Sequence, residues 1–216
     1  MKKRLNELTL IEPFDNGDTG RKNSSVKDCF MGMRLWVYSV DADILRAAWG
    51  SNDFALLKRI TPEFNLSTEP DDASKDDEPS DGAIIKQVLI GKVSSRNNCH
   101  GIWRLVRYFG TLLAEEECLV DGKVDWVLKR CGVVDLINSK ILNGDARTPL
   151  PFLLPSSDPF PTMSYIDAAA VREVLEKMAP LDVMRINKQI ARGVIRIYGW
   201  IEKAAANGQS LMTFVT

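Results

Sequence analysis

MRLWVYSV, the stretch from Met33 to Val40, decides the fold of this chain. Its apolar side chains fall at both odd and even positions and include β-favouring types, a pattern typical of a strand buried on both faces. A second short apolar stretch, LMTFV at residues 211–215, lies at the other end of the sequence. We predict that strands at about 33–40 and 211–215 pair at the centre of a small sheet, within a helix-rich α+β domain.

The sequence between these two strands predicts helices. Apolar residues recur there at spacings of three and four, and Gly, Pro or Asn-Gly follow each segment. The longest apolar stripe runs from Val183 to Ala204. The predicted helices are Ala42–Trp49 (capped by Asp41 or Asp43), Phe54–Ile60, Ala83–Ile90, Cys99–Leu113, Val124–Arg130, Val133–Leu142, Ile166–Met178 (with Ser164 as its cap) and Asp182–Ala206.

Length and composition indicate one globular domain with an appendage. The chain has 216 residues, of which 45% are hydrophobic and 26% charged, close to the average of folded domains. Residues 1–30 are polar and irregular and are predicted to form an N-terminal arm. The domain is then expected to span residues 31–216, with an acidic loop at about 66–82.

This acidic loop is the most unusual charge feature of the sequence. The net charge of the whole chain is only -1, but residues 69–81 carry -6 and leave +5 on the remainder. Such a segment is either a soluble insertion that does not pack or a segment that attracts a basic partner electrostatically. The residues expected to contact a partner are Asp71, Asp72, Asp76, Asp77 and Glu78.

A smaller basic face is predicted on the last helix. Four cations follow one another at spacings of three, four and four, which places them on one side of that helix. Salt bridges to the domain's own acids are the default interpretation, and nucleic-acid binding ranks last because no groove-reading motif accompanies the cations. The residues of this face are Arg185, Lys188, Arg192 and Arg196.

The sequence offers no recognised catalytic, metal or cofactor motif. Its single histidine, His100, excludes multi-histidine metal sites, and no Gly-rich phosphate loop or Gly-x-Ser-x-Gly elbow occurs. The four cysteines lack the close spacing of structural zinc ligands, which argues against a zinc site formed by Cys99, His100, Cys118 and Cys131. We therefore expect no catalytic residues, metal or cofactor, with reduced cysteines in the cytoplasm.

An unrecognised enzyme is the alternative interpretation. It would use His100, or carboxylates such as Asp125 and Asp135, in a pocket near the Pro-rich segment 149–161. A membrane span is excluded by the lack of a long apolar run. All five tryptophans lie in apolar periodic segments and are expected in the core: Trp36, Trp49, Trp103, Trp126 and Trp200.

Several short motifs carry a family resemblance across residues 31–216. They are Met31-Gly32-Met33 before the first strand, KQVLIG at 86–91, ILNG at 141–144, PLPFLL at 149–154, Met163-Ser164-Tyr165, AAANG at 204–208 and the terminal strand from Ser210 to Val215. With these motifs the chain resembles the YfbM-like family of small, mostly uncharacterised bacterial proteins. The arm and the acidic loop depart from that family.

The resemblance implies an α+β domain without assigned catalytic residues, and some relatives look like immunity proteins encoded beside antibacterial toxins. Together with the acidic loop, this leads to the expected function. We expect a non-enzymatic protein-binding module, specifically an immunity protein that occludes a basic toxin domain. A homo-oligomer is compatible with the sequence.

Overall fold

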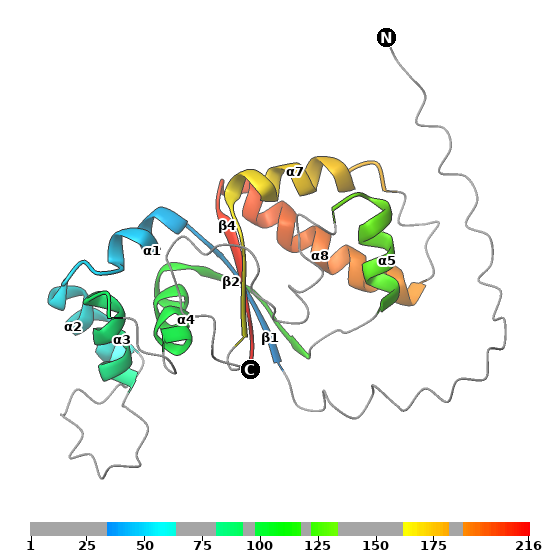
Figure 1. Cartoon of the computed structure of the whole chain (residues 1–216). Helices are drawn as coiled ribbons and strands as arrows, with labels where there is room; N and C mark the ends of the chain where they lie inside the picture. Colours follow the sequence, from blue (N-terminus) through cyan, green and yellow to red (C-terminus); the bar gives the residue numbers. More distant parts are fainter. Residues whose placement is uncertain (1–33, 64–80, 93–97, 118–121, 134–161, 182–187) are drawn as a thin grey trace. The chain divides into compact units, whose positions relative to one another are not determined.

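A computed structural model describes residues 34–63, 81–92, 98–117, 122–133, 162–181 and 188–216. The chain divides into two units, Met1–Met31 and Gly32–Thr216, and every described residue belongs to the second. Figure 1 shows its helices and strands. They are β1 (Arg34–Val40), α1 (Ala42–Ala48), α2 (Phe54–Glu63), α3 (Asp81–Leu89), α4 (Asn98–Phe109), β2 (Thr111–Glu117), α5 (Gly122–Arg130), β3 (Thr162–Ile166), α7 (Ala168–Met178), α8 (Lys188–Ala206) and β4 (Ser210–Val215).

The first and last strands pair at the centre of one sheet, as predicted. The strand order is β2-β1-β4-β3, and every pairing is antiparallel. Within the central pair, Leu35 lies opposite Val215 and Val40 opposite Ser210. Trp36 Nε1 also donates a hydrogen bond of 3.1 Å to Thr216 Oγ1. The α+β class and the pairing of the two terminal strands are confirmed.

Helices cover both faces of this sheet. Leu35 and Val37 of β1 belong to a core cluster with residues of α5, α7 and α8. Their neighbours Trp36 and Tyr38 point the other way, into a cluster with residues of α1, α2, α3 and α4. Because successive side chains alternate between faces, a strand between two helical layers buries both sets of side chains and is apolar over most of its length. This explains the continuous apolar stretch from Leu35 to Tyr38 in β1.

The strand β2 replaces the end of a predicted helix. The sequence predicts a helix from Cys99 to Leu113, but α4 ends at Phe109. A Cβ atom on Gly110 would lie 2.7 Å from the carbonyl oxygen of Val106 and 2.9 Å from that of Ser39. The chain therefore passes directly against the backbone of β1 at this glycine. The following residues pair with β1, which outweighs the helical spacing of their leucines.

The strand β3 was also missed, and the predicted cap of the next helix is wrong. Ser164 is buried in β3 opposite Thr213 rather than capping a helix. The cap of α7 is Asp167, whose carboxylate accepts a hydrogen bond of 2.7 Å from Ala170 N. Both residues are good caps by type, so only the pairing of β3 with β4 distinguishes them.

The other predicted helices differ mainly at their ends. Asp41 caps α1, and α2 continues through Pro62 to Glu63 instead of ending at Ile60. Pro62 lies in the last turn, so the hydrogen bond that it removes is followed by only one further helical residue. The predicted helix Val133–Leu142 and the Pro-rich segment 149–161 fall outside the described residues, except for Val133, as do residues 182–187 of the predicted last helix.

Two glycines of α8 provide a matched test of its packing. An ideal Cβ on Gly193 would lie 2.8 Å from Val124 Cγ2 of α5, whereas one on Gly199 meets no atom within 4 Å. We expect Gly199→Ala to stabilise the protein by up to about 1 kcal/mol through helix propensity. Gly193→Ala should be less stable than Gly199→Ala by about 1–3 kcal/mol, because overpacking offsets the same gain. Urea unfolding measures both, and equal values would contradict close packing at Gly193.

Candidate functional site

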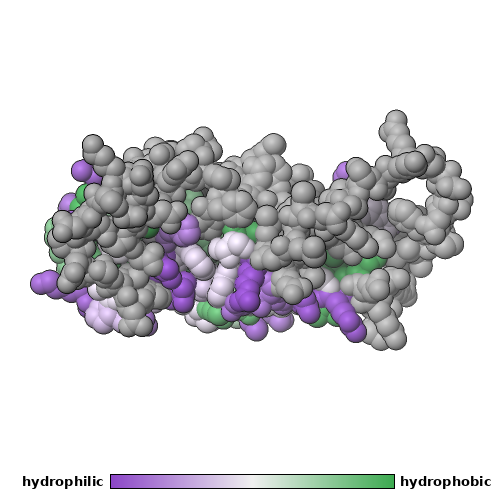
Figure 2. Space-filling view, turned by 90° about the horizontal axis from the view of Figure 1, so that it is seen from below, coloured by the Kyte–Doolittle hydropathy of each residue, from purple (hydrophilic) through white to green (hydrophobic). Residues whose placement is uncertain are grey.

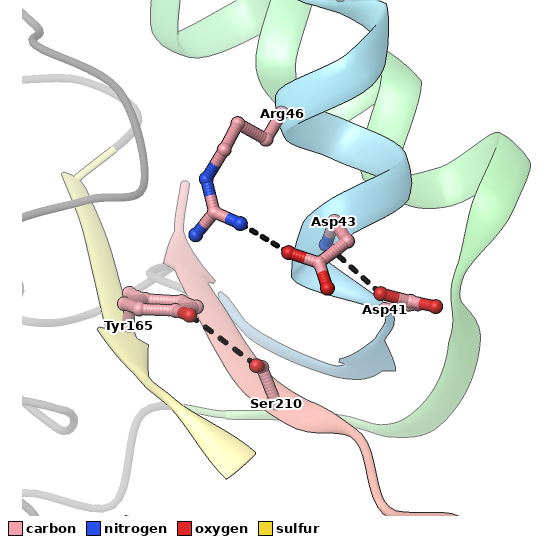
Figure 3. Close-up of polar contacts among 5 residues, drawn as sticks. All are labelled: Asp41, Asp43, Arg46, Tyr165 and Ser210. Carbon is pink, nitrogen blue, oxygen red and sulfur yellow. Dashed lines mark hydrogen bonds and ion pairs between the residues drawn. The ribbon is translucent and has the colours of Figure 1, made fainter.

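One end of the sheet gathers polar groups from three elements, β3, β4 and α1. Tyr165 of β3 and Ser210 of β4 are buried, and their hydroxyl oxygens lie 3.3 Å apart. Arg46 and Asp43 of α1 form an ion pair beside them, and Figure 3 shows the two pairs together. Asp41 N-caps α1 by accepting a hydrogen bond of 2.8 Å from Asp43 N. This sheet end is therefore a candidate site for binding or chemistry.

The environment of Tyr165 limits what this site does. Burial raises the pKa of the Tyr165 phenol above its ordinary value, against the lowering effects of the Ser210 hydrogen bond and Arg46. A phenol acting as a general base needs a pKa lowered toward neutrality. Tyr165 is instead held protonated, where it hydrogen-bonds to Ser210. The hydroxyl pair thus satisfies two buried polar groups at the point where β3 and β4 meet.

The raised pKa makes stability depend on pH. Below about pH 10 the Tyr165 phenol is protonated in both states; above it the unfolded chain ionises first, so stability falls with rising pH. We expect Tyr165→Phe to reduce this alkaline loss, although it should cost about 1 kcal/mol at pH 7 by removing the bond to Ser210. Urea midpoints between about pH 7 and pH 11 measure both effects. An unchanged alkaline slope would show that Tyr165 does not contribute.

A second group of aromatic and basic residues surrounds Trp103 of α4. Its ring meets Trp36 edge-on at 5.6 Å and Phe214 at 6.1 Å between centroids. The guanidinium carbons of Arg104 and Arg107 lie 5.4 Å and 5.6 Å from the Trp103 ring centroid. Cation–π contacts of this kind stabilise packing without requiring a ligand. Trp103 therefore packs α4 against the sheet.

His100 joins the same aromatic group. Its ring lies 6.3 Å from that of Trp103, and the residue is partly buried near the start of α4. Cys99 and Cys131 are free thiols, and burial raises the pKa of the Cys131 thiol. Cys29 and Cys118 fall outside the described residues. Across the parts of the chain that the structure describes, no group of His, Cys, Asp and Glu is arranged to hold a metal ion.

The five acids expected to contact a partner lie outside the described residues: Asp71, Asp72, Asp76, Asp77 and Glu78. The helices that flank them are described. Leu56 and Ile60 of α2 share a core cluster with Ile85 and Val88 of α3. In the chain, the acidic segment thus lies between two helices, α2 and α3, that pack in the same cluster.

The predicted basic face is only partly described. Arg185 falls outside the described residues, and so does the side chain of Lys188. Arg192 is exposed on α8. Arg196 pairs with Glu116 of β2, with 2.6 Å between Arg196 Nη1 and Glu116 Oε2. For Arg196, this agrees with the interpretation that these cations pair with the domain's own acids.

Trp126 is the functional candidate that the sequence analysis misplaced. It was expected in the core, but it is 41% exposed on α5. The guanidinium carbon of Arg130, one helical turn later, lies 4.7 Å from the centroid of its ring. Their spacing of four residues on a short helix was the available signal, since Val124, Val127 and Leu128 define the buried side. The rival enzymatic carboxylates stay untested, because the side chain of Asp125 and all of Asp135 are outside the described residues.

The described surface on the face shown in Figure 2 is mainly polar. In the view of Figure 2 the described residues are largely hydrophilic, and the apolar ones form small separate areas. The exposed large apolar side chains include Ile44, Phe54, Leu112 and Ile195. Among the described helices, none has the length and apolar character needed to cross a membrane.

Comparison with known proteins gives one match. The chain belongs to a family described as a domain of unknown function (DUF7691), whose model matches residues 31–216. Neither the curated proteins nor the solved structures contain a significant match. The family model thus covers the whole described region and leaves out the first thirty residues.

Proposed function

We propose that this member of the DUF7691 family is a cytoplasmic protein-binding module rather than an enzyme. Its specific role is that of an immunity protein, which neutralises an antibacterial toxin by occluding it. The acidic segment binds a basic surface of the toxin through Asp71, Asp72, Asp76, Asp77 and Glu78. The immunity role follows from the resemblance to YfbM-like proteins, which is likewise a proposal.

One structural observation supports this proposal: the helices that precede and follow the acidic segment in the chain, α2 and α3, are packed together. Gly50 N donates a hydrogen bond of 3.1 Å to the carbonyl of Val88, and Asn52 N one of 2.9 Å to that of Leu89. These bonds join the chain between α1 and α2 to the end of α3. Together with the packed α2–α3 pair, they fix the two helices between which the acidic segment lies in the chain. A terminal acidic tail would have one attachment, whereas this segment has two.

The exposed ion pairs of the described surface are also weak enough to be replaced by ion pairs with a partner. The ion pairs Arg34–Glu115 and Lys177–Glu173 each measure 2.8 Å and lie at the surface. Exposed pairs of this kind contribute about 0–1 kcal/mol, so a partner's charges can replace them at little cost. Complementary charge also directs the approach of a basic partner before contact.

The test is to purify the tagged full-length protein from its native host at low and moderate salt. The expected result is one stoichiometric basic partner that salt releases, whose expression alone arrests growth and whose toxicity this protein suppresses. The matched control carries Asp71→Asn, Asp72→Asn, Asp76→Asn, Asp77→Asn and Glu78→Gln, which keep side-chain shape and remove charge. Equal recovery of the partner by this control would exclude the acidic segment as the contact. Recovery of no partner would favour an enzymatic role.

A further inference from the structure

The outward face of α5 combines an exposed tryptophan with positive charge. Trp126 lies there beside Arg130, and Lys129 is exposed next to them. Within the part of the chain that the structure describes, neither Lys129 nor Arg130 forms an ion pair. We call Trp126, Lys129 and Arg130 the α5 face.

Helix stability explains the cations of this face but not its tryptophan. Lys129 and Arg130 occupy the last turn of α5, where positive charge complements the helix dipole. α5 carries three bases and one acid, Asp125, so its net charge is positive. An exposed Trp126 brings no such benefit. Tryptophan and arginine are the residue types that contribute most to protein interfaces, which indicates that this face is covered when it functions.

The acidic run at residues 69–81 has the complementary chemistry. It carries -6 while the rest of the chain carries +5, and Pro70 and Pro79 flank its main cluster of acids. Proline-rich segments dock readily on aromatic side chains. However, α2 and α3, which flank the run, belong to the core cluster on one face of the sheet, and α5 belongs to the cluster on the other. The acidic run of a second copy can meet the α5 face of the first copy without passing from one face of the sheet to the other.

We propose that the α5 face binds the acidic run of a second copy of this chain. A two-fold arrangement makes the contact twice, because each copy offers one run and one face. The resulting dimer occupies the acids that the proposed function assigns to a toxin, so self-association and toxin binding compete. The proposal goes beyond that function and is tested on the protein alone.

A protein occupant is favoured over single-stranded nucleic acid. Sites for single strands stack successive bases on several aromatic side chains along a basic groove. The α5 face has a single aromatic ring, Trp126, and the acidic run of the same chain repels phosphates. A polypeptide carrying carboxylates and proline matches one ring with cations around it.

A charge-swap experiment tests the contact directly. The face variant is Lys129→Glu with Arg130→Glu, and the run variant replaces Asp71, Asp72, Asp76, Asp77 and Glu78 by Lys. Sedimentation equilibrium of the full-length protein should show a dimer at an ionic strength of about 0.05 M that weakens about tenfold or more at about 0.5 M. Each variant alone should be a monomer, because its run and face then carry charge of the same sign. Mixing the two variants should restore a dimer, since each run then meets a face of opposite sign.

Two further variants distinguish an effect of the α5 face on dimerisation from an effect of net charge or of folding. Lys58→Glu with Lys203→Glu changes the net charge equally at exposed positions of α2 and α8 and should leave the dimer intact. Trp126→Ala should weaken the dimer about tenfold with an unchanged melting temperature. A wild-type monomer at low salt, an unaffected face variant, or a mixture that stays monomeric would each overturn the proposal. So would binding of oligothymidylate to the α5 face without self-association.

Discussion

Replacing Phe214 by alanine should lower the free energy of unfolding by about 3–5 kcal/mol, the range for truncating a buried aromatic residue. Phe214 has no exposed surface and lies in β4, at the centre of the sheet. Its ring meets Tyr38 edge-on at 6.1 Å and Trp103 at 6.1 Å between centroids. The substitution thus removes contacts with both β1 and α4. Because neither strand nor helix can close the space alone, a cavity should remain.

The exposed Phe54 at the start of α2 provides the control. It is 46% exposed, so Phe54→Ala removes the same atoms from a position largely in contact with solvent. We expect it to change stability by less than about 1 kcal/mol. For a domain of this size, Phe214→Ala should lower the melting temperature by about 6–20 °C. Similar losses for the two variants would contradict the assigned core.

If Phe214→Ala fails to fold, Phe214→Leu keeps the prediction testable. Leucine retains much of the volume but not the edge-on aromatic contacts, so the expected loss is about 1–2 kcal/mol. Denaturant unfolding should show a lower midpoint with an unchanged slope. Unchanged stability in Phe214→Leu would mean that the ring contacts with Tyr38 and Trp103 contribute nothing.

The terminal strands and α8 were predictable because each carries its signal within one segment. β1 is apolar from Leu35 to Tyr38 and at Val40, so apolar side chains fall on both faces of the strand and indicate its burial without reference to the rest of the chain. β2 and β3 lack such a signal. Leu112 and Leu113 continue the helical spacing of α4, and only their position beside β1 makes them a strand. The short Thr162–Ile166 stretch becomes a strand by pairing with β4, which is distant in sequence.

The candidate sites were less predictable for the same reason. Tyr165 and Ser210 are 45 residues apart, and only the register of β3 against β4 brings their hydroxyls together. The exposure of Trp126 depends on which side of α5 packs against α8. The charge of the acidic run, in contrast, can be read directly from sequence, because a local charge density needs no tertiary contact.

Reversing the five acids of this run should slow association with the basic partner by about 10²–10³-fold at low salt. The changes Asp71→Lys, Asp72→Lys, Asp76→Lys, Asp77→Lys and Glu78→Lys turn a segment charge of -6 into +4. Attraction then becomes repulsion over a Debye length of about 10 Å at 0.1 M salt. Stopped-flow measurement with the captured partner, at protein concentrations low enough to keep this chain monomeric, should give a rate constant that falls steeply with salt for the wild type. For the reversed protein it should rise with salt.

The dissociation rate tells whether these acids also lie in the final contact. Charges that only direct the approach change the association rate, whereas acids paired and desolvated in the complex change the dissociation rate as well. The Asn and Gln variant, which is neutral at the five positions, should associate at an intermediate rate. If its dissociation is also faster than that of the wild type, the acids pair with the partner's cations. If all three proteins associate equally at every salt concentration, the acidic run does not recognise the partner, because long-range attraction must respond to charge.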